Sequence, residues 1–195
     1  MQSLVLATRN PHKLREFSRL LEPAGIAVEP LPEEVELPPE VGDTFTANAR
    51  PKAHTAAAAT GRASIADDSG IEAAALDGVP GVRSARYAGE HATDEENLVK
   101  LIAEAPPGSG LRYVCVLVYV DPVSGEEHVF EGICSGTMSA SRRGERGFGY
   151  DPVFVPDDGD GERTFAEFSD AEKDEISHRG RAARALAAWL QSAGE

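Results

Sequence analysis

The sequence predicts a protein of the α/β class. Short apolar runs typical of buried strands alternate with helix-length segments in which apolar residues recur every three or four positions. Ser3 to Ala7 is the first apolar run, and an amphipathic helix pattern follows it directly. Leu111 to Val120 is the most apolar run, and we expect a central strand there because both faces are apolar from Tyr113 onward. At 195 residues the chain can bury a proper core, so we expect one domain over residues 1–195, or two lobes that share a sheet.

The helix after the first strand has a clear start and end. Asn10 is a good N-cap, and Pro11 suits the first helical position, where its missing N–H has no helical partner to lose. The apolar stripe expected to be buried consists of Leu14, Phe17 and Leu21. Gly25 marks the end of the helix.

The loop between this strand and helix is a candidate phosphate site. It presents a hydroxyl, two cations and an amide, from Thr8, Arg9, Asn10 and Lys13. The dipole at a helix N-terminus favours an anion by about 0.3 to 1 kcal/mol, and free N–H groups add to this. An ordinary capped helix with a basic exposed face explains the same residues slightly better when they are taken alone. No Gly-Lys pair occurs, so there is no P-loop.

An irregular segment and a second helix are expected next. Residues 29–43 are rich in proline and glutamate, and they supply carboxylates such as Glu40. Thr44 can cap a second helix. Pro51 conflicts with a helix interior, because it removes a hydrogen bond and costs about 3 kcal/mol. Either the helix kinks there or it begins near Arg50.

The stretch Asp67 to Gly70, with the sequence DDSG, carries two adjacent carboxylates. An apolar run at Ser64 to Ala66 precedes it, so we interpret DDSG as a strand end that positions chemistry. An Asp-rich turn explains these residues about equally well, because turns favour Asp, Ser and Gly for backbone reasons. A strand-like segment over Ile71 to Leu76 is expected to follow.

A helix and a hairpin are predicted in the second half of the chain. The helix runs from Thr93 to Ala105, and its inward residues are expected to be Leu98, Leu101 and Ile102. The strand at Leu111 to Val120 then leads through a turn into His128 to Met138, which predicts an antiparallel hairpin. Gly132 to Gly136 imitates a nucleophile elbow, but it lies inside a strand, so we reject that function.

The region after the hairpin is dense in glycine. Gly144 to Pro152 lets backbone approach a ligand closely, and Phe148 or Tyr150 can stack on a base. A loop that links strands explains this segment equally well. Asp157 to Glu162 suggests a calcium loop, but Ser169 stands where a bidentate Glu is required, so we expect a solvated acidic loop.

Two helices are expected to close the chain. Ser169 and Glu172 form a capping box for a short helix that carries Lys173. The last helix begins with His178 and Arg179, where positive charge gains nothing from the helix dipole, and this placement favours ligand binding. Its core-packing residues are expected to be Ala182, Leu186, Trp189 and Leu190.

Charge and composition restrict the partners. The chain has 33 acidic and 19 basic side chains and a net charge of −14, which argues against a nucleic acid polymer or an anionic membrane. An anionic ligand must then be small and offset by local cations or a divalent metal. Cys115 and Cys134 lie in strand-like segments and predict buried free thiols, with pairing across the hairpin left open. Without an export signal or an apolar run of about 18 residues, a soluble cytoplasmic protein is expected.

Six blocks occur in order from the first strand to the last helix: LATRNPHK, TFxxNAxxKA, ADDSG, LDGVPGVRSARYAG, GFGYDPVF and EKDEISHRG. Together they resemble the inosine triphosphate pyrophosphatases, also called XTP/dITP diphosphatases, over nearly the whole chain. The resemblance implies an α/β fold with an elongated mixed β-sheet flanked by helices, and two lobes with the active-site cleft between them. It also implies Mg²⁺-dependent hydrolysis of dITP, ITP or XTP to the monophosphate and pyrophosphate, usually by a homodimer.

The resemblance also assigns roles to residues. It makes Asp68 a metal ligand and the general base, places Glu40 near the metal, and gives Ser69 to the substrate. Asp67 can add a further hard oxygen ligand for Mg²⁺. The residues assigned to the triphosphate are Thr8, Arg9, Asn10 and Lys13. Those assigned to the base are Phe148, Gly149, Tyr150, Asp151, Lys173, His178 and Arg179.

The sequence departs from the family pattern in three places: Arg9 replaces a frequent Gly, Ala47 replaces a frequent Glu, and Pro51 is unexpected. Donors from Lys173, His178 or Arg179 would pair with a 6-oxo purine and reject adenine by about 10⁴-fold. Two alternatives remain open. One is a pyrophosphatase for modified pyrimidine nucleotides or 7-methyl-GTP, and the other is a nucleotide-sensing module without turnover.

Overall fold

The computed structural model describes residues 2–193, and the chain divides into two compact units. Unit 1 is built from Met1–Asp68, Cys115–Gly132 and Arg179–Glu195, and unit 2 from Ser69–Val114 and Ile133–His178. Each unit has a hydrophobic core of its own. The ends of the predicted domain, residues 1 and 195, lie outside the described residues.

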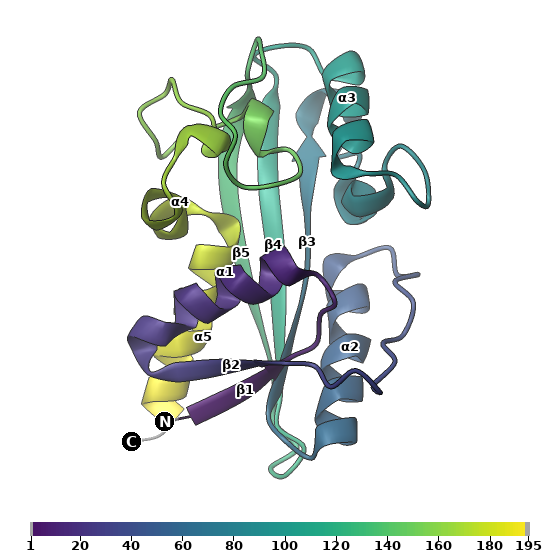
Figure 1. The fold of residues 1–195 in the computed structure, drawn as a ribbon, viewed down its shortest axis with the longest axis vertical. Helices are drawn as coiled ribbons and strands as arrows, with labels where there is room; N and C mark the ends of the chain where they lie inside the picture. The colour runs from purple at the N-terminus through teal and green to yellow at the C-terminus, as the bar shows by residue number, and fades with distance from the viewer. Residues whose placement is uncertain (1, 194–195) are drawn as a thin grey trace. The chain divides into compact units, whose positions relative to one another are not determined.

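The strands of the described residues form a six-stranded sheet in the order β2-β1-β3-β4-β5-β6. β1 (Gln2–Leu6) pairs in parallel with β2 (Ile26–Pro30) and with β3 (Ser64–Ala73). β5 (Glu127–Met138) pairs antiparallel with β6 (Phe154–Pro156). Helices flank these strands (Figure 1). The sheet is therefore mixed, which confirms the predicted α/β class with a mixed, helix-flanked sheet.

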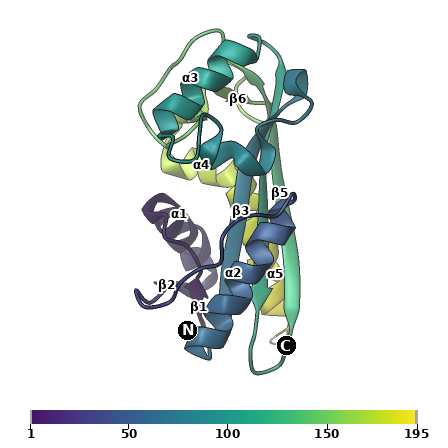
Figure 2. The same cartoon turned by 90° about the vertical axis from the view of Figure 1, so that its right-hand side faces the viewer.

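Unit 1 places helices on both faces of its strands. They are α1 (Pro11–Leu21), α2 (Phe45–Thr60) and most of α5 (His178–Ala193). Leu4 of β1 packs in a core with residues of α1 and α5. The next residue, Val5, lines a recess with residues of α2. Figure 2 shows α1 and α2 on either side of β1 and β3. Alternate residues of one strand therefore meet different helices.

The predicted start of α1 is confirmed, whereas the α-helix ends four residues before the predicted stop at Gly25. The Oδ1 atom of Asn10 accepts hydrogen bonds from the backbone N–H of His12 at 2.8 Å and of Lys13 at 3.4 Å. The helix ends at Leu21, and a short 3₁₀ turn leads to Gly25. Gly25 has a φ of 72°, a left-handed conformation that glycine adopts without steric cost.

α2 runs through Pro51, so the alternative start near Arg50 is wrong. The Thr44 hydroxyl caps the helix by accepting from the N–H of Ala47 at 3.1 Å. Pro51 cannot donate to the carbonyl of Ala47, but both residues are exposed, so water can satisfy that oxygen. The helix therefore tolerates a proline that a buried turn would not. Its small buried residues are Ala49, Ala53, Ala56 and Ala57.

Unit 2 contains α3 (Asp94–Glu104), α4 (Asp170–Ile176) and the first part of β4 (Gly110–Val120). The predicted capping box of Ser169 and Glu172 begins α4. Among the described residues, no helix is long and apolar enough to cross a membrane.

The inward face of α3 differs from the prediction. Leu98 and Leu101 are buried, whereas Ile102 is 38% exposed. Asn97 occupies the inner face instead: it donates to the carbonyl of Ala85 at 3.1 Å and accepts from the N–H of Ala88 at 2.8 Å. The buried face of α3 is therefore formed by Asn97, Leu98 and Leu101 and does not include Ile102.

The DDSG stretch lies inside β3 and not at its end, so the prediction of a strand end was wrong. β1 pairs with β3 only through Val5 with Ser64 and Leu6 with Ile65, and the N–H of Ala7 then donates to the Ile65 carbonyl at 2.8 Å. β1 therefore stops just before Asp67, so both aspartates lie beyond the last residue of β1 that pairs with β3.

The predicted hairpin is confirmed. β4 and β5 are neighbours in the sheet, and in the turn between them the N–H of Asp121 donates to the carbonyl of Glu126 at 2.9 Å. Gly132 to Gly136 lies within β5, as expected when the nucleophile elbow was rejected. Cys115 and Cys134 are buried thiols that form no disulfide bond with each other, which confirms the prediction of buried thiols.

Candidate functional site

Asp67 and Asp68 face opposite sides of β3, because successive residues of a strand alternate. Ile65, two residues before Asp67, packs in the core with α1 and α5. Asp67 shares that face, and Asp68 faces α2. The two residues are only 1% and 4% exposed. The two adjacent aspartates therefore have different surroundings, although the sequence alone does not distinguish them.

Asp67 is surrounded by cations. The ammonium of Lys13 lies 2.9 Å from Oδ2 of Asp67, and Nε of Arg179 lies 3.6 Å from the same oxygen. Arg179 also pairs with Glu16 of α1 at 2.9 Å. Burial disfavours the charge of Arg179, but Glu16 and Asp67 outweigh it and raise the pKa of the guanidinium. Lys13 therefore points at β3 and does not belong to an exposed basic face of α1.

Asp68 is held by α2. Nδ2 of Asn48 donates to Oδ2 of Asp68 at 2.9 Å. Lys52, one turn further along the helix, donates to Oε1 of Glu40 at 2.5 Å and to the backbone oxygen of Asp67 at 2.7 Å. One buried lysine thus ties Glu40 to the strand that carries Asp68.

The surroundings of Asp68 raise the pKa of its carboxyl. Burial is the largest cause, because it disfavours the charged form. The charge of Lys52 and the hydrogen bond from Asn48 lower the pKa, while the charge of Glu40 raises it again. Asp68 is therefore a more basic carboxylate than an exposed aspartate.

The guanidinium of Arg9 anchors the irregular segment that leads to Glu40. It donates to the backbone oxygens of Leu31, Pro32, Glu33 and Val35 at 2.9, 2.8, 3.1 and 2.6 Å. Beyond Glu40, the N–H of Gly42 donates to Oδ1 of Asn48 at 2.8 Å. The segment is held on both sides of Glu40. A contact between Arg9 and a triphosphate stays a prediction.

Thr8 and Asn10 support the start of α1. The hydroxyl oxygen of Thr8 accepts from the N–H of Asn10 at 3.2 Å. The Asn10 side chain already accepts from the N–H groups of His12 and Lys13, so the cap occupies donors that a phosphate would otherwise use. An anion at this site would depend more on side chains than the sequence alone suggested.

In unit 2, Asp151 is the centre of a second cluster. Its Oδ2 lies 2.5 Å from the ammonium of Lys173 and accepts from the N–H of Phe148 at 3.0 Å. Its Oδ1 accepts from the hydroxyl of Tyr113 at 3.1 Å. The ammonium of Lys173 also lies 5.5 Å from the centre of the Phe165 ring, within the range of a cation–π contact. Lys173 and Asp151 therefore form an ion pair with no net charge, and it lies among aromatic rings.

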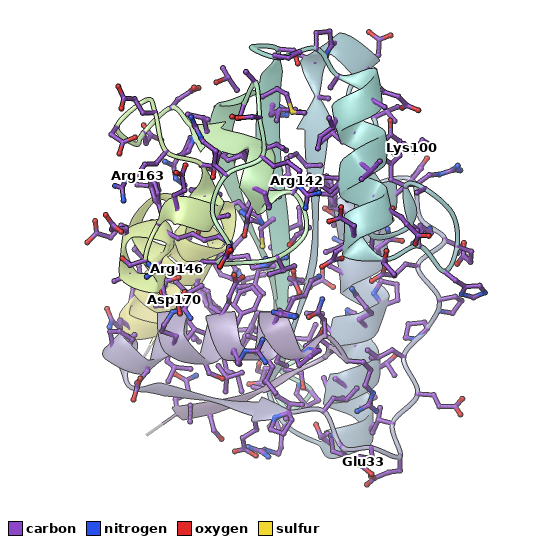
Figure 3. All side chains as sticks on the ribbon, turned by 45° about the horizontal axis from the view of Figure 1, so that its top comes forward. Glu33, Lys100, Arg142, Arg146, Arg163 and Asp170 are labelled. Carbon is purple, nitrogen blue, oxygen red and sulfur yellow. The ribbon has the colours of Figure 1, made fainter. Side chains whose placement is uncertain are left out.

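Two glycines shape the loop around Asp151. A Cβ atom on Gly147 would lie 2.0 Å from Oδ2 of Asp151, so only glycine lets the backbone pass that close. Gly149 has a φ of 61°, and its N–H donates to Oδ2 of Asp94 at 3.3 Å. Arg142, which lies beside α3 in Figure 3, forms an ion pair with Glu95 at 2.6 Å. The first turn of α3 therefore contacts the loop on both sides of Gly147.

The two aromatic residues of this loop differ in exposure. Tyr150 is buried, its hydroxyl donates to the carbonyl of Ser84 at 2.7 Å, and burial raises the pKa of its phenol. Phe148 is half-buried. Of the two rings predicted to stack on a base, that of Phe148 is the accessible one.

His178 and Arg179 are neighbours in sequence with different contacts. The ring of His178 stacks on Tyr113 in unit 2, with centroids 4.6 Å apart and planes at 8°. Arg179 contacts Glu16 and Asp67 in unit 1. Ser69 is half-buried within β3. The structure thus groups Arg179 with the carboxylates and His178 with the aromatic cluster.

Sequence reasoning missed Asn48, Glu16 and Tyr113 and left Lys52 without a role. A signal existed for two of them: Asn48 and Lys52 lie four apart in the block TFxxNAxxKA, which places them on one helix face. For Tyr113 and Glu16 we find no local signal, because a tyrosine in an apolar strand and a glutamate on a helix are common.

The donor set on the α2 side of β3 fits a hard divalent cation in part. Among the described residues, no group of three or more His, Cys, Asp or Glu side chains is arranged to hold a metal ion. However, Asp68 and Glu40 are close enough for the charge of Glu40 to raise the pKa of Asp68. Mg²⁺ typically takes one or two carboxylates and completes its shell with water and phosphate oxygens. The two carboxylates match that requirement.

The fold and the cluster on β3 define an α/β protein with a buried, cation-lined acidic centre. Residues 4–189 match the model of the Ham1 family. The chain belongs to this family.

Relatives and solved structures agree along the whole chain. A dITP/XTP pyrophosphatase of Mycolicibacterium paratuberculosis is 45% identical, over 98% of this chain and 97% of the relative. The dITP/XTP pyrophosphatase of Mycobacterium tuberculosis is 46% identical, over 97% and 95%. The structure of a HAM1 protein from Coxiella burnetii matches with a TM-score of 0.86 and 38% identity, over 98% of this chain and 100% of that chain.

Proposed function

We propose that this protein hydrolyses non-standard purine nucleoside triphosphates, dITP, XTP and ITP, to the nucleoside monophosphate and pyrophosphate. Relatives named dITP/XTP pyrophosphatases, 45% and 46% identical over nearly the whole chain, support the substrate class. The observation that carries the proposal is the placement of Asp68 on β3. It is a buried carboxylate with a raised pKa, it is linked through α2 to Glu40, and its neighbour Asp67 pairs with Lys13.

We assign Mg²⁺ to Asp68 and Glu40, with Asp67 in a supporting role. The ion, when bound, would offset the charge of the triphosphate and polarise the attacked phosphorus. Asp67 would keep Lys13 and Arg179 in place from the other face of β3, since both cations lie against its Oδ2. Lys52 would hold Glu40 while substrate is absent.

In the reaction, Asp68 accepts a proton from a water molecule. The water oxygen forms a bond to the α-phosphorus while the bond from that phosphorus to the bridging oxygen breaks. The electron pair of that bond leaves with pyrophosphate, beside Lys13 and the start of α1. The raised pKa of Asp68 makes the carboxylate a better proton acceptor.

The purine is assigned to the Asp151 cluster, through Phe148 for stacking and Lys173 for donation. Hypoxanthine and xanthine present an acceptor at the 6-position, where adenine presents a donor. The ammonium of Lys173 can only donate, so it would face the 6-amino donor of adenine and the two groups could not form a hydrogen bond. Gly149, Tyr150 and His178 belong to the same prediction. Arg179 was also assigned to the purine, but its contacts with Glu16 and Asp67 support a place in the charged cluster instead.

We extend the proposal to assembly and location: a homodimer in the cytoplasm, with neither a nucleic acid polymer nor a membrane as partner. The net charge of −14 supports the last part, because polyanions and anionic bilayers repel such a surface. Light scattering during gel filtration tests the assembly, and a mass equal to that of one chain would contradict it.

The decisive experiment is a substrate panel with detection of released pyrophosphate. It contains dITP, XTP, dUTP, 7-methyl-GTP and the four usual dNTPs, with and without Mg²⁺. We expect the highest kcat/KM for dITP or XTP and none without the metal. Equal or better rates on dUTP or 7-methyl-GTP would favour the alternative pyrophosphatase. Binding of dITP without turnover would indicate a sensing module.

A further inference from the structure

Tyr113 lies at the centre of the Asp151 cluster, although no sequence motif includes it. It belongs to β4 and is 7% exposed. Its hydroxyl donates to Oδ1 of Asp151 at 3.1 Å, and its ring stacks on His178 with centroids 4.6 Å apart. One side chain therefore contacts two residues that are assigned to the purine.

We propose that Tyr113 is a positioning residue that sets the preference for 6-oxo purines. This inference rests on the proposed function and adds a specificity determinant to it. The hydroxyl of a tyrosine lies in the plane of its ring, and this ring is within 8° of parallel to the imidazole of His178. The orientation of His178 and the direction of the hydrogen bond to Asp151 are therefore coupled through one rigid group.

The hydroxyl of Tyr113 also controls how strongly Asp151 holds Lys173. A buried carboxylate needs donors on both oxygens. Oδ2 of Asp151 has Lys173 and the Phe148 N–H, and Oδ1 has Tyr113. Without the hydroxyl, the charge of Asp151 would be less well satisfied at Oδ1, so its ion pair with Lys173 would become stronger. The ammonium would then donate less well to the 6-oxo group of a purine.

The ring of Tyr113 is fixed by its neighbours, so a change at its hydroxyl can be isolated. Its centroid lies 4.8 Å from that of Phe154 and 6.1 Å from that of Phe165. Tyr113→Phe keeps these contacts and the stack on His178 and removes one oxygen atom. The variant therefore tests the hydrogen bond separately from packing.

Tyr119 supplies a matched control on the same strand. It is 4% exposed and packs edge-on against Trp189, with centroids 5.0 Å apart. Like Tyr113 it is a buried aromatic of β4, but its cluster is the core of unit 1. Tyr119→Phe removes the same atom without touching Asp151.

The experiment measures kcat/KM for dITP and dATP in the wild type, Y113F and Y119F with Mg²⁺. We expect Y113F to lower kcat/KM for dITP about tenfold, since one hydrogen bond to a charged group is lost, and to lower the dITP-to-dATP ratio by a similar factor. Y119F should keep the wild-type ratio. An unchanged ratio in Y113F, or an equal change in Y119F, would overturn the proposal.

Failure of the proposed function gives a different result. If the wild type does not hydrolyse dITP or XTP, that function is wrong, and Tyr113 is judged by calorimetric binding of dIMP and dAMP. A preference for dIMP that Y113F loses would support Tyr113, and no preference in the wild type would overturn it. If Y113F does not fold, Y113M takes its place, because it fills much of the same space and also lacks the hydroxyl that Asp151 accepts from. Y113M is expected to lose the preference, and an unchanged preference in it would overturn the proposal.

Discussion

The clusters around Asp67 and Asp151 each pair a buried aspartate with a lysine, but their surroundings differ. Lys13 and Asp67 lie 2.9 Å apart next to further charges, from Arg179, Glu16 and the network of Asp68. Lys173 and Asp151 lie 2.5 Å apart among aromatic rings and glycines. A charge-dense setting suits phosphate and metal, whereas a neutral pair among rings suits a heterocycle. The same type of ion pair thus lies in two settings, to which we assign the two parts of the proposed substrate.

The largest expected effect tests the charged cluster. Asp68→Asn should lower kcat for dITP by about 10² to 10⁴-fold, because a general base is lost while the amide oxygen can still accept from Asn48. Steady-state release of pyrophosphate measures the change. Asp157→Asn, an exposed change in an acidic loop, is the control. A rate within twofold of the wild type would remove Asp68 from the mechanism.

The second prediction separates the clusters directly. Lys13→Met should lower kcat/KM for all triphosphates by a similar factor, on the order of 10²-fold, since the proposal places this lysine at the phosphates that they share. Lys173→Met should reduce the dITP-to-dATP ratio instead. The exposed Arg15→Met on α1 controls for charge. A changed base preference in Lys13→Met would contradict the division.

Stability should follow the same division. Removing one partner of a buried ion pair costs about 3–5 kcal/mol. Lys173→Met leaves Asp151 buried with neutral donors, whereas after Lys13→Met the guanidinium of Arg179 still faces Asp67. We expect the larger loss for Lys173→Met in urea unfolding. Equal losses would mean that Arg179 does not compensate for Lys13.

The pH dependence of stability gives a smaller effect. Burial raises the pKa of Asp68 in the folded protein, so its contribution to stability is fully present below the unfolded pKa and is lost as pH rises through the folded pKa. Asparagine does not ionise, so Asp68→Asn removes this loss of stability at higher pH. We therefore expect the variant to be more stable than the wild type at pH 7, with a difference that shrinks at acidic pH. Thermal unfolding across pH measures this, and a less stable variant at pH 7 would contradict it.

The smallest effect concerns the segment before α2. Arg9→Ala should change stability by less than about 1 kcal/mol, because most of its hydrogen bonds are exposed. Amide hydrogen exchange over residues 31–35 should nevertheless become faster in metal-free protein. Arg19→Ala on α1 is the control. Unchanged exchange in Arg9→Ala would mean that the segment is held by other contacts.

Much of the fold could be predicted from local patterns. Asn10, Thr44 and Ser169 each mark a helix start through a side chain that accepts a backbone N–H, and such signals are short in range. The position of DDSG within β3 could not be predicted the same way. It depends on where β1 stops pairing, which is a contact between distant parts of the chain.

The sequence predicted several residues of the candidate site, but it did not predict which residues they contact. Asp68 stood out as one of two carboxylates after an apolar run, Lys13 as a cation at a helix N-terminus, and Asp151 through the family resemblance. Their partners depend on which face of an element each residue occupies, and Asn97 shows how one polar contact changes that face. Tyr113 could not be found at all, since its role comes from the packing of residues 38 positions apart in sequence.

The alternation along β3 limits how this gene can vary. Loss or gain of one codon between Ile65 and Asp67 would exchange the faces of the two aspartates, so each would meet the other's helix. A change of two codons would restore the faces but move the carboxylates by two residues relative to the end of β1. Single substitutions in this strand leave the faces of the other residues unchanged, whereas insertions and deletions do not. Natural variation in length is therefore expected to occur in exposed loops such as residues 157–162.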